Sequence, residues 1–399
     1  MSLSLSGSDG FPAGTCDTRN IAIMVAGFCA MINLYAPQAI LPLLSESFSA
    51  PPVRVALTVT ATALAVGCIA PVAGAFSDAK GRKPVIIAGL ILTALPTLAC
   101  ALVPTLDLLI LFRFLQGLFM PAVFVATLAY VAEESAPHER GRVSALYVTS
   151  NVLGGFAGRM IGSAAVEWGD WHLAFVTLGG LNLLGAALVR LLMPPSQNFK
   201  GSASLARSVA SIPLHLCNRQ LLSCFAIGFG VLFSQVAVFT YLTFHLAGPP
   251  FFYGPLVLGG LFVSYLIGAA ATPFAGRFVD RFGHRRVLRG ATVVASLGIV
   301  LTLLPALAVI LVGLSILCLA MFLCQSVTTS YVGLAATQDR SSAAGLYLAF
   351  YYAGGAVGAF LPGFAYLRGG WTSCAILAVA IQTCIGLLST YAWRSTKMA

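Results

Sequence analysis

Twelve long apolar segments, separated by short polar loops, constrain what this chain can fold into more than any other feature. A helix needs about 20 mostly apolar residues to cross a bilayer, and the segments are of that length. Charged residues make up only 9% of the 399 residues, whereas soluble domains carry about 25%. We therefore predict an all-α polytopic membrane protein. The predicted spans are 20–43, 54–76, 84–103, 107–131, 143–166, 172–193, 220–246, 254–275, 286–305, 307–331, 342–366 and 372–393.

The basic residues indicate the orientation, because cytoplasmic loops of membrane proteins carry an excess of Lys and Arg. With both termini inside, 18 of the 22 Lys and Arg residues fall in cytoplasmic segments, and the outer loops hold only Arg54 and Arg368. We predict cytoplasmic termini and a place in the cell inner membrane. The net charge of +10 does not indicate nucleic-acid binding, because no RNA-binding or zinc-finger motif accompanies it.

The chain also repeats itself. Gly74, Asp78 and Gly81 match Gly276, Asp280 and Gly283 at an offset of 202 residues. At an offset of 200, Leu146, Tyr147, Gly154, Gly155, Gly158 and Trp171 match Leu346, Tyr347, Gly354, Gly355, Gly358 and Trp371. We predict two pseudo-symmetric six-helix bundles, 20–193 and 220–393, with a cytoplasmic linker at 194–219 and cytoplasmic tails at 1–19 and 394–399. Duplicated halves place a solute site between them, near the middle of the membrane.

The segment from Gly74 to Val85 resembles the loop signature of the major facilitator superfamily. The resemblance implies a twelve-helix transporter in which this loop latches the first half to the start of span 11. It assigns latch roles to Gly74, Asp78, Gly81, Arg82 and Lys83, echoed by Gly276, Asp280, Gly283 and Arg285. The glycines permit sharp turns and close approach of helix ends. For the basic residues alone, the positive-inside rule is a sufficient alternative explanation.

Two arginines fall inside predicted spans, where an ionised side chain is costly and marks function by default. Arg113 opens RFLQG in span 4, which resembles a second motif of the superfamily. The alternative is a structural arginine that snorkels or binds backbone carbonyls. Arg159 lies in span 5 within NVLGGFAGRMIG, which resembles the glycine-rich signature of the drug:proton antiporter branch, although that signature has a proline at this position. Solute contact or gating on the one hand, and a structural hydrogen bond between helices on the other, are both open for Arg159.

The span 5 glycines are spaced by three and four residues and therefore share one side of a helix. We expect them to form a smooth packing face against another helix of the same half. These residues are Gly154, Gly155, Gly158 and Gly162.

None of the twelve acidic residues lies in the middle of a predicted span. A cation exporter usually keeps a buried carboxylate, whereas two buried arginines favour an anionic or strongly polar solute. If protons are coupled, Asp107, Glu133 and Glu134 at the ends of span 4 are the candidates, as is Glu46. Solvated loop carboxylates are the alternative for each.

Polar and aromatic residues inside spans are candidates for the wall of the solute cavity. They are Asn33, Tyr35, Gln38, Gln116, Asn151, Gln235, Phe239, Tyr241, Gln325, Tyr347, Tyr351 and Tyr352. For each aromatic residue, plain helix packing is the alternative.

The sequence therefore predicts a secondary active transporter, with proton-driven efflux of a small organic solute as the leading function. A proton-coupled importer of a polar nutrient and a solute-sensing membrane protein are the alternatives. We expect no cofactor, no metal and no enzymatic activity, because the chain has no nucleotide-binding loop and no clustered metal ligands. The expected partners are the small-molecule substrate, protons and the lipid bilayer, and the expected oligomeric state is a monomer.

Overall fold

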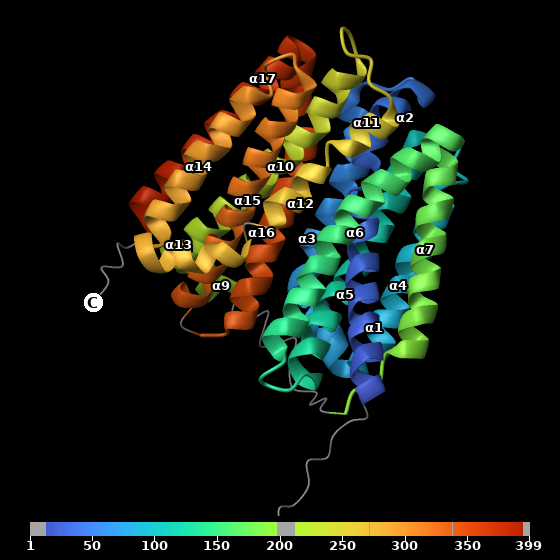
Figure 1. Cartoon of the computed structure of the whole chain (residues 1–399), viewed down its shortest axis with the longest axis vertical. Helices are drawn as coiled ribbons and strands as arrows, with labels where there is room; N and C mark the ends of the chain where they lie inside the picture. The colour runs from blue at the N-terminus through green and yellow to red at the C-terminus, as the bar shows by residue number, and fades with distance from the viewer. Residues whose placement is uncertain (1–12, 198–211, 271, 337, 394–399) are drawn as a thin grey trace, which may run out of the picture.

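The computed structural model describes residues 13–197, 212–270, 272–336 and 338–393, and every regular element in these ranges is helical (Figure 1). The first half of the chain forms α1 (Ala13–Ile32), η1 (Ala36–Ile40), α2 (Leu41–Ser47), α3 (Pro52–Lys80), α4 (Arg82–Cys100), α5 (Leu106–Glu134), α6 (Arg140–Trp168) and α7 (Trp171–Leu192). The second half forms α9 (Ile212–Cys217), α10 (Arg219–Ala247), α11 (Pro255–Gly260), α12 (Val263–Ala269), η2 (Thr272–Phe274), α13 (Ala275–Phe282), α14 (His284–Leu301), α15 (Leu307–Ala335), α16 (Arg340–Phe360) and α17 (Pro362–Ala392).

The predicted tails and linker fall largely on residues 1–12, 198–211 and 394–399, outside the described ranges. The side chains of residues 74–80, which include Asp78, are also outside the described part.

Eight helices in the described ranges are long and apolar enough to cross a membrane, or nine if the bent pair at the N-terminus is one span. The chain is thus a multi-pass membrane protein, although length and hydropathy do not reproduce the count of twelve. α14 falls short because its 18 residues include Arg285, Arg286 and Arg289. α6 has 29 residues, but its Gly, Ser, Asn and Arg residues lower its hydropathy.

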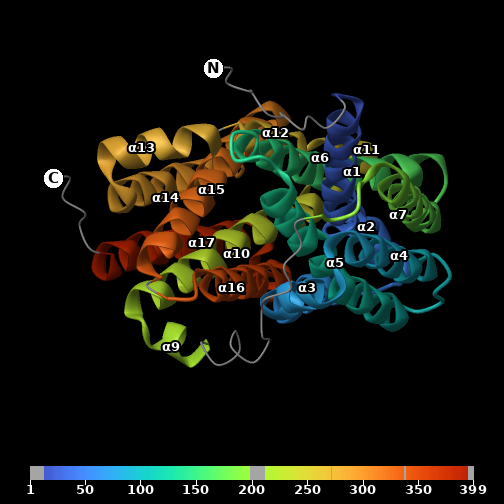
Figure 2. The same ribbon diagram turned by 90° about the horizontal axis from the view of Figure 1, so that it is seen from below.

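The helices gather into two bundles that lie side by side, α1–α7 in one and α10–α17 in the other (Figures 1 and 2). α3 packs along α16, and α6 packs against α11 and α12, and these contacts join the halves. We name the end of the molecule that holds Trp171 and Tyr253 the expected outer face. The end that holds Arg82 and Arg140 is the expected cytoplasmic face.

Equivalent glycines let equivalent helices touch in the two bundles. A Cβ added at Gly158 would overlap the carbonyl oxygen of Ile32 in α1. At the repeat position, a Cβ added at Gly358 would overlap the carbonyl oxygen of Phe233 in α10. Gly154 and Gly354 meet the same two helices one turn earlier, at Phe28 and Phe229. The internal repeat of the sequence thus corresponds to repeated packing of backbone on backbone.

At the other two glycines of span 5, Gly155 and Gly162, a larger side chain would fit. A Cβ added at Gly155 would lie 3.7 Å from Nη1 of Arg159, and one added at Gly162 would lie 3.7 Å from the carbonyl oxygen of Ala36. Both distances are ordinary van der Waals contacts. The close packing of α6 on α1 therefore depends on Gly154 and Gly158.

Replacing Gly158 with alanine should destabilise the protein, because the new methyl group cannot fit beside Ile32 without moving a helix. We expect the free energy of unfolding to fall by about 1–3 kcal/mol, the usual cost of overpacking. Thermal unfolding in detergent measures this, with Gly155→Ala as the matched control on the same helix. Equal stabilities of the two variants would contradict the packing role.

The loop glycines of the repeat share one backbone conformation. Gly81 joins α3 to α4 with φ +85° and ψ 155°, and Gly283 joins α13 to α14 with φ +77° and ψ 152°. Positive φ favours glycine because a Cβ would clash with the backbone. The predicted turn role of these two residues is consistent with this geometry.

Two predicted spans are broken. Span 1 bends by 44° between α1 and η1, where Pro37 is the second residue of the new helical segment. Span 8 breaks after Gly260, so the expected continuous helix over 254–275 is wrong. Proline at a first helical position and adjacent glycines are the local causes. The predicted loop between spans 11 and 12 coincides with Gly369 and Gly370, which leave helical geometry inside α17.

Candidate functional site

Arg159 projects from α6 into the region between the two bundles and is 2% exposed. Its Nε and Nη2 atoms donate to Oε1 of Gln38, at 3.2 and 2.8 Å, and Nη1 donates to the carbonyl oxygen of Gly155 at 2.7 Å. These bonds use three of the five N–H groups of a guanidinium. No carboxylate pairs with Arg159 among the described residues.

Three aromatic rings from both halves surround this guanidinium. Its central carbon lies 4.4 Å from the ring centre of Phe262, 4.8 Å from that of Tyr265 and 5.3 Å from that of Tyr35. Aromatic faces attract a cation through their quadrupole, most strongly where water is excluded. The rings hold the positive charge in place without neutralising it.

Gln38 connects the arginine to the second half. Its Nε2 donates to Oγ1 of Thr240 at 2.9 Å and to the carbonyl oxygen of Val236 at 3.4 Å, both on α10. The hydroxyl of Thr243 donates to the main-chain oxygen of Gln38 at 3.4 Å. One buried amide thus links α6 of the first half to α10 of the second.

The halves also pack closely on the expected outer side of this network. A Cβ added at Gly259 of α11 would lie 2.6 Å from Oγ of Ser163 on α6. A Cβ added at Gly363 of α17 would lie 2.5 Å from Cγ2 of Val53 on α3. At these two points the helices of the two halves are in direct contact on this side of Arg159.

Arg113 has a different environment, inside the first bundle, where it is completely buried. It donates to the carbonyl oxygens of Asn33 (2.9 Å), Leu34 (2.7 Å) and Thr58 (3.2 Å). It also contacts Oε1 of Gln116. The carbonyls of Asn33 and Leu34 follow the end of α1 at Ile32. This geometry favours the structural alternative, in which Arg113 stabilises the break in span 1.

The predicted cavity residues separate into groups. Tyr35 and Gln38 contact Arg159, and Phe239 stacks against Phe262 at 4.9 Å and meets Tyr265 at 4.8 Å. Gln235 lies beside the Tyr265 hydroxyl. The Tyr35 hydroxyl is buried, has no hydrogen-bond partner among the described residues, and would lie 2.8 Å from a Cβ added at Gly355 of α16.

Tyr347, Tyr351 and Tyr352 form a ring cluster on α16, with centroid distances of 6.0 and 5.6 Å, and Tyr352 meets Phe124 of the first half at 6.3 Å. Tyr352 therefore lies where α16 faces the first bundle, whereas the ring of Tyr347 lies against Gly228 of α10 in the second bundle.

Other predicted cavity residues lie within a single bundle. Gln116 donates to Oγ1 of Thr97 in the first half, and Tyr241 donates to the carbonyl oxygen of Ala359 in the second. The amide of Asn33 is buried without a partner among the described residues. Asn151 lies against Gly27 of α1, and Gln325 is half-buried on α15.

Phe262, Tyr265 and Thr240 were not predicted, although all three contact the Arg159–Gln38 pair. One signal was present for the first two. They follow Gly259 and Gly260, and a glycine-interrupted apolar segment in a duplicated carrier points to a binding site.

The acidic candidates for proton coupling lie at the ends of α5. Glu133 forms an ion pair with Arg82, with Nε to Oε2 at 3.0 Å. Oε1 of Glu134 accepts from the amide of Gln197 at 2.8 Å. Asp107 pairs with Arg54 at 3.0 Å on the surface, where their side chains are 72% and 55% exposed. Among residues whose burial is described, no Asp or Glu is buried.

Two of the predicted latch residues make contacts within the first half. Arg82 pairs with Glu133 across the ends of α4 and α5, and Nζ of Lys83 donates to the main-chain oxygen of Met193 after α7. The contact with the start of span 11 stays a prediction, because the side chain of Asp78 lies outside the described part.

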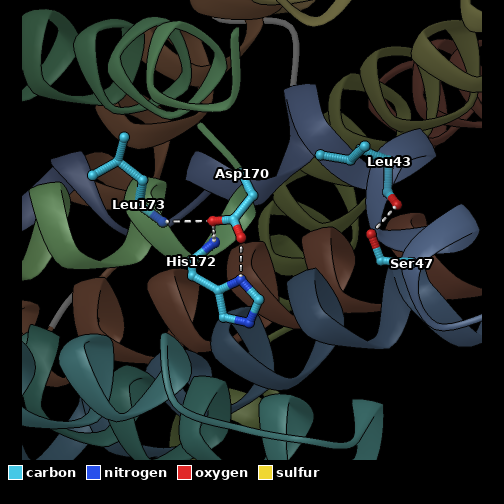
Figure 3. Close-up of polar contacts among 5 residues, drawn as sticks. All are labelled: Leu43, Ser47, Asp170, His172 and Leu173. Carbon is cyan, nitrogen blue, oxygen red and sulfur yellow. Dashed lines mark hydrogen bonds and ion pairs between the residues drawn. The ribbon is translucent and has the colours of Figure 1, made fainter. Parts of the chain in front are cut away.

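An Asp–His pair caps α7 at the expected outer face (Figure 3). Oδ1 of Asp170 accepts from the amides of His172 (2.9 Å) and Leu173 (3.2 Å), and Oδ2 lies 2.7 Å from Nδ1 of His172. The hydrogen bond from His172 holds the pKa of Asp170 below its usual value. Trp171 packs on Phe48, after α2, at 5.3 Å. This arrangement is a helix cap that fixes α7 beside α2.

Comparisons with known proteins agree with this architecture. The family model of the Major Facilitator Superfamily matches residues 23–270 and 253–397. The chain is 31% identical over 383 residues to the uncharacterized MFS-type transporter YybF of Bacillus subtilis, covering 94% of each chain. It is 30% identical over 371 residues to the inner membrane transport protein YnfM of Escherichia coli, covering 92% of this chain and 88% of that protein.

Among solved structures, a bacterial homolog of the human lysosomal transporter Spinster, inward-facing and occupied, matches with a TM-score of 0.79. The identity is 14%, over 97% of this chain and 100% of that chain.

This chain belongs to the Major Facilitator Superfamily, whose members are membrane transporters. The resemblance inferred from the loop signature is confirmed, as is the all-helical fold in two bundles. Among the described residues, no group of three His, Cys, Asp or Glu side chains is placed to hold a metal ion.

Proposed function

We propose that this protein is a secondary active transporter that exports a small organic anion from the cell. One observation carries the proposal. Arg159 is a buried cation between the two halves, held by an amide and three rings, with no acidic partner among the described residues. A buried charge is costly unless it is paired, so an anionic solute group gains most at this position.

Alternating access supplies the mechanism. The halves, proposed as 20–193 and 220–393, rock about the site, as in other carriers with duplicated halves. The two remaining N–H groups of Arg159 suit a carboxylate or phosphate, since a guanidinium binds such groups through a planar fork. The rings of Tyr35, Phe262 and Tyr265 suit an apolar or sugar-like body attached to the anionic group.

The proposed direction of transport rests on the negative charge of the solute. Bacterial cells are negative inside, and moving one negative charge outward through 100 mV releases about 2.3 kcal/mol. The membrane potential by itself therefore drives export of an anion. Proton coupling stays a prediction, because the candidate carboxylates Asp107, Glu133 and Glu134 all lie at the ends of α5. A place in the inner membrane and a monomeric state remain part of the proposal.

Uptake into inside-out membrane vesicles tests this function, with citrate and glucuronate as anionic probes and tetraphenylphosphonium as the cationic probe. We expect an interior-positive potential to drive uptake of at least one anion beyond that of vesicles without the protein, and to give no protein-dependent uptake of the cation. A pH gradient imposed without a potential separates proton coupling from potential drive. Uptake of the cation alone would overturn the proposal.

A further inference from the structure

A groove of about 300 Å³ lies on the second half, away from the Arg159 site, between α13, α14 and α15. Both ribbon views place α13 and α14 at the side of the second bundle farthest from the first half (Figures 1 and 2). The groove is lined by Phe278, Phe282, Arg286, Val287, Gly290, Ala291, Val294, Leu319, Ala320 and Leu323.

The groove joins apolar walls to one charge. Arg286 is the single charged residue of its lining and lies in the first turn of α14, at the expected cytoplasmic face. Phe278, Phe282 and Leu319 are between 40% and 46% exposed. A strip of exposed apolar surface beneath a cation matches the two parts of an anionic phospholipid, its acyl chain and its phosphate.

The arginines around the groove have no counter-ion among the described residues. Arg277, Arg281, Arg285, Arg286 and Arg289 lie on α13 and α14, and none forms an ion pair in the described part of the chain. Asp280 is the one acidic residue on these two helices. The local excess of positive charge calls for an external anion.

The internal repeat explains this excess. In the first half, Glu133 near the end of α5 pairs with Arg82. α15 has the same 29-residue length as α5, and its start at Leu307 sets an offset of 201 residues from Leu106. Glu133 and Glu134 therefore correspond to Leu334 and Ala335. The loop between α13 and α14 therefore has basic residues, as its counterpart in the first half does. It has no acidic residues at the positions that correspond to Glu133 and Glu134.

We propose that this groove binds an anionic phospholipid of the cytoplasmic leaflet. Arg286 holds the phosphate, Arg289 one turn along α14 adds to the local positive charge, and one acyl chain lies along Phe278, Val294 and Leu323. The proposal is independent of the transported solute, because the groove lining shares no residue with the contacts of Arg159.

Two variants test the binding of the lipid phosphate and of its acyl chain separately. Arg286→Gln removes the charge at the groove. Gly290→Leu fills it, and a Cβ at Gly290 meets nothing within 4 Å, so the fold tolerates the change. Arg142→Gln, an exposed arginine of the first half, is the control for charge. Gly333→Leu is the control for bulk, because Gly333 is an exposed glycine of α15 with equally open surroundings.

Native mass spectrometry of the purified full-length protein, titrated with palmitoyl-oleoyl phosphatidylglycerol or phosphatidylcholine, measures the binding. We expect the wild type and both controls to retain the anionic lipid preferentially. Arg286→Gln should weaken phosphatidylglycerol binding about fivefold, the usual effect of one basic residue at an anionic surface, and Gly290→Leu should also weaken it.

The proposal fails if both groove variants bind phosphatidylglycerol as tightly as the wild type does. It also fails if inorganic phosphate displaces the lipid, because the site would then recognise a free anion. Thermal unfolding of each variant shows whether a loss of binding arises from a loss of fold.

Discussion

Replacing Arg159 with methionine should lower transport of the anionic solute about 100-fold while leaving most of the protein folded. The substitution keeps an unbranched apolar side chain that matches the stem of arginine and removes the guanidinium with its charge. Truncating one partner of a buried charge pair costs about 2–5 kcal/mol, and the solute loses its partner in this variant. Initial rates of uptake into inside-out vesicles, normalised to folded protein, give the size of the loss.

Two further variants make this result specific. Arg159→Lys keeps the charge but loses the planar fork, so we expect intermediate activity. Arg54→Met removes an exposed arginine whose ion pair with Asp107 contributes little, and its transport should match the wild type. Wild-type transport by Arg159→Met would remove the main support for an anionic solute.

The same substitution at Arg113 should have the opposite pattern, a large loss of stability. Arg113→Met leaves the carbonyls of Asn33 and Leu34 and the side-chain oxygen of Gln116 without their donor, whereas Thr58 keeps the hydroxyl of Thr62. Each buried group left unsatisfied costs about 1–3 kcal/mol. Since whole proteins are stable by only about 5–15 kcal/mol, little folded protein should remain.

The yield of monodisperse protein and the midpoint of thermal unfolding measure this effect. Arg159→Met is the matched control, because that change removes a donor only from Gln38 and Gly155. A stable Arg113→Met variant that does not transport would assign Arg113 to the solute site instead. The two variants thus test opposite roles for the two intramembrane arginines.

The site residues that the sequence could predict are the charged and polar ones, which are costly to expose to lipid. Arg159 and Gln38 stood out because a charge or an amide inside a span needs a partner. The glycines at 154 and 158 stood out through the repeat. Phe262 and Tyr265 did not stand out in this way, because an aromatic ring in an apolar segment can pack equally well against lipid or against a cation.

Which face a residue occupies was harder to predict. The apolar window of α10 is 83% buried, so its sequence carries no polar side to indicate which residues face the other half. Tyr241 was accordingly placed in the cavity, whereas its hydroxyl binds α16 within the second bundle. Gln116 was placed there for its polarity, although it pairs with Arg113 inside the first bundle.

The double role of Gln38 has a consequence for adapting this carrier to new solutes. The side-chain oxygen of Gln38 accepts from the arginine that would bind the solute, and its side-chain nitrogen donates to Thr240 of the opposite half. Under the proposed function, we expect a substitution of Gln38 that changes selectivity to alter the contact between the halves as well, and with it the turnover rate. Selectivity and turnover would then be coupled at this position.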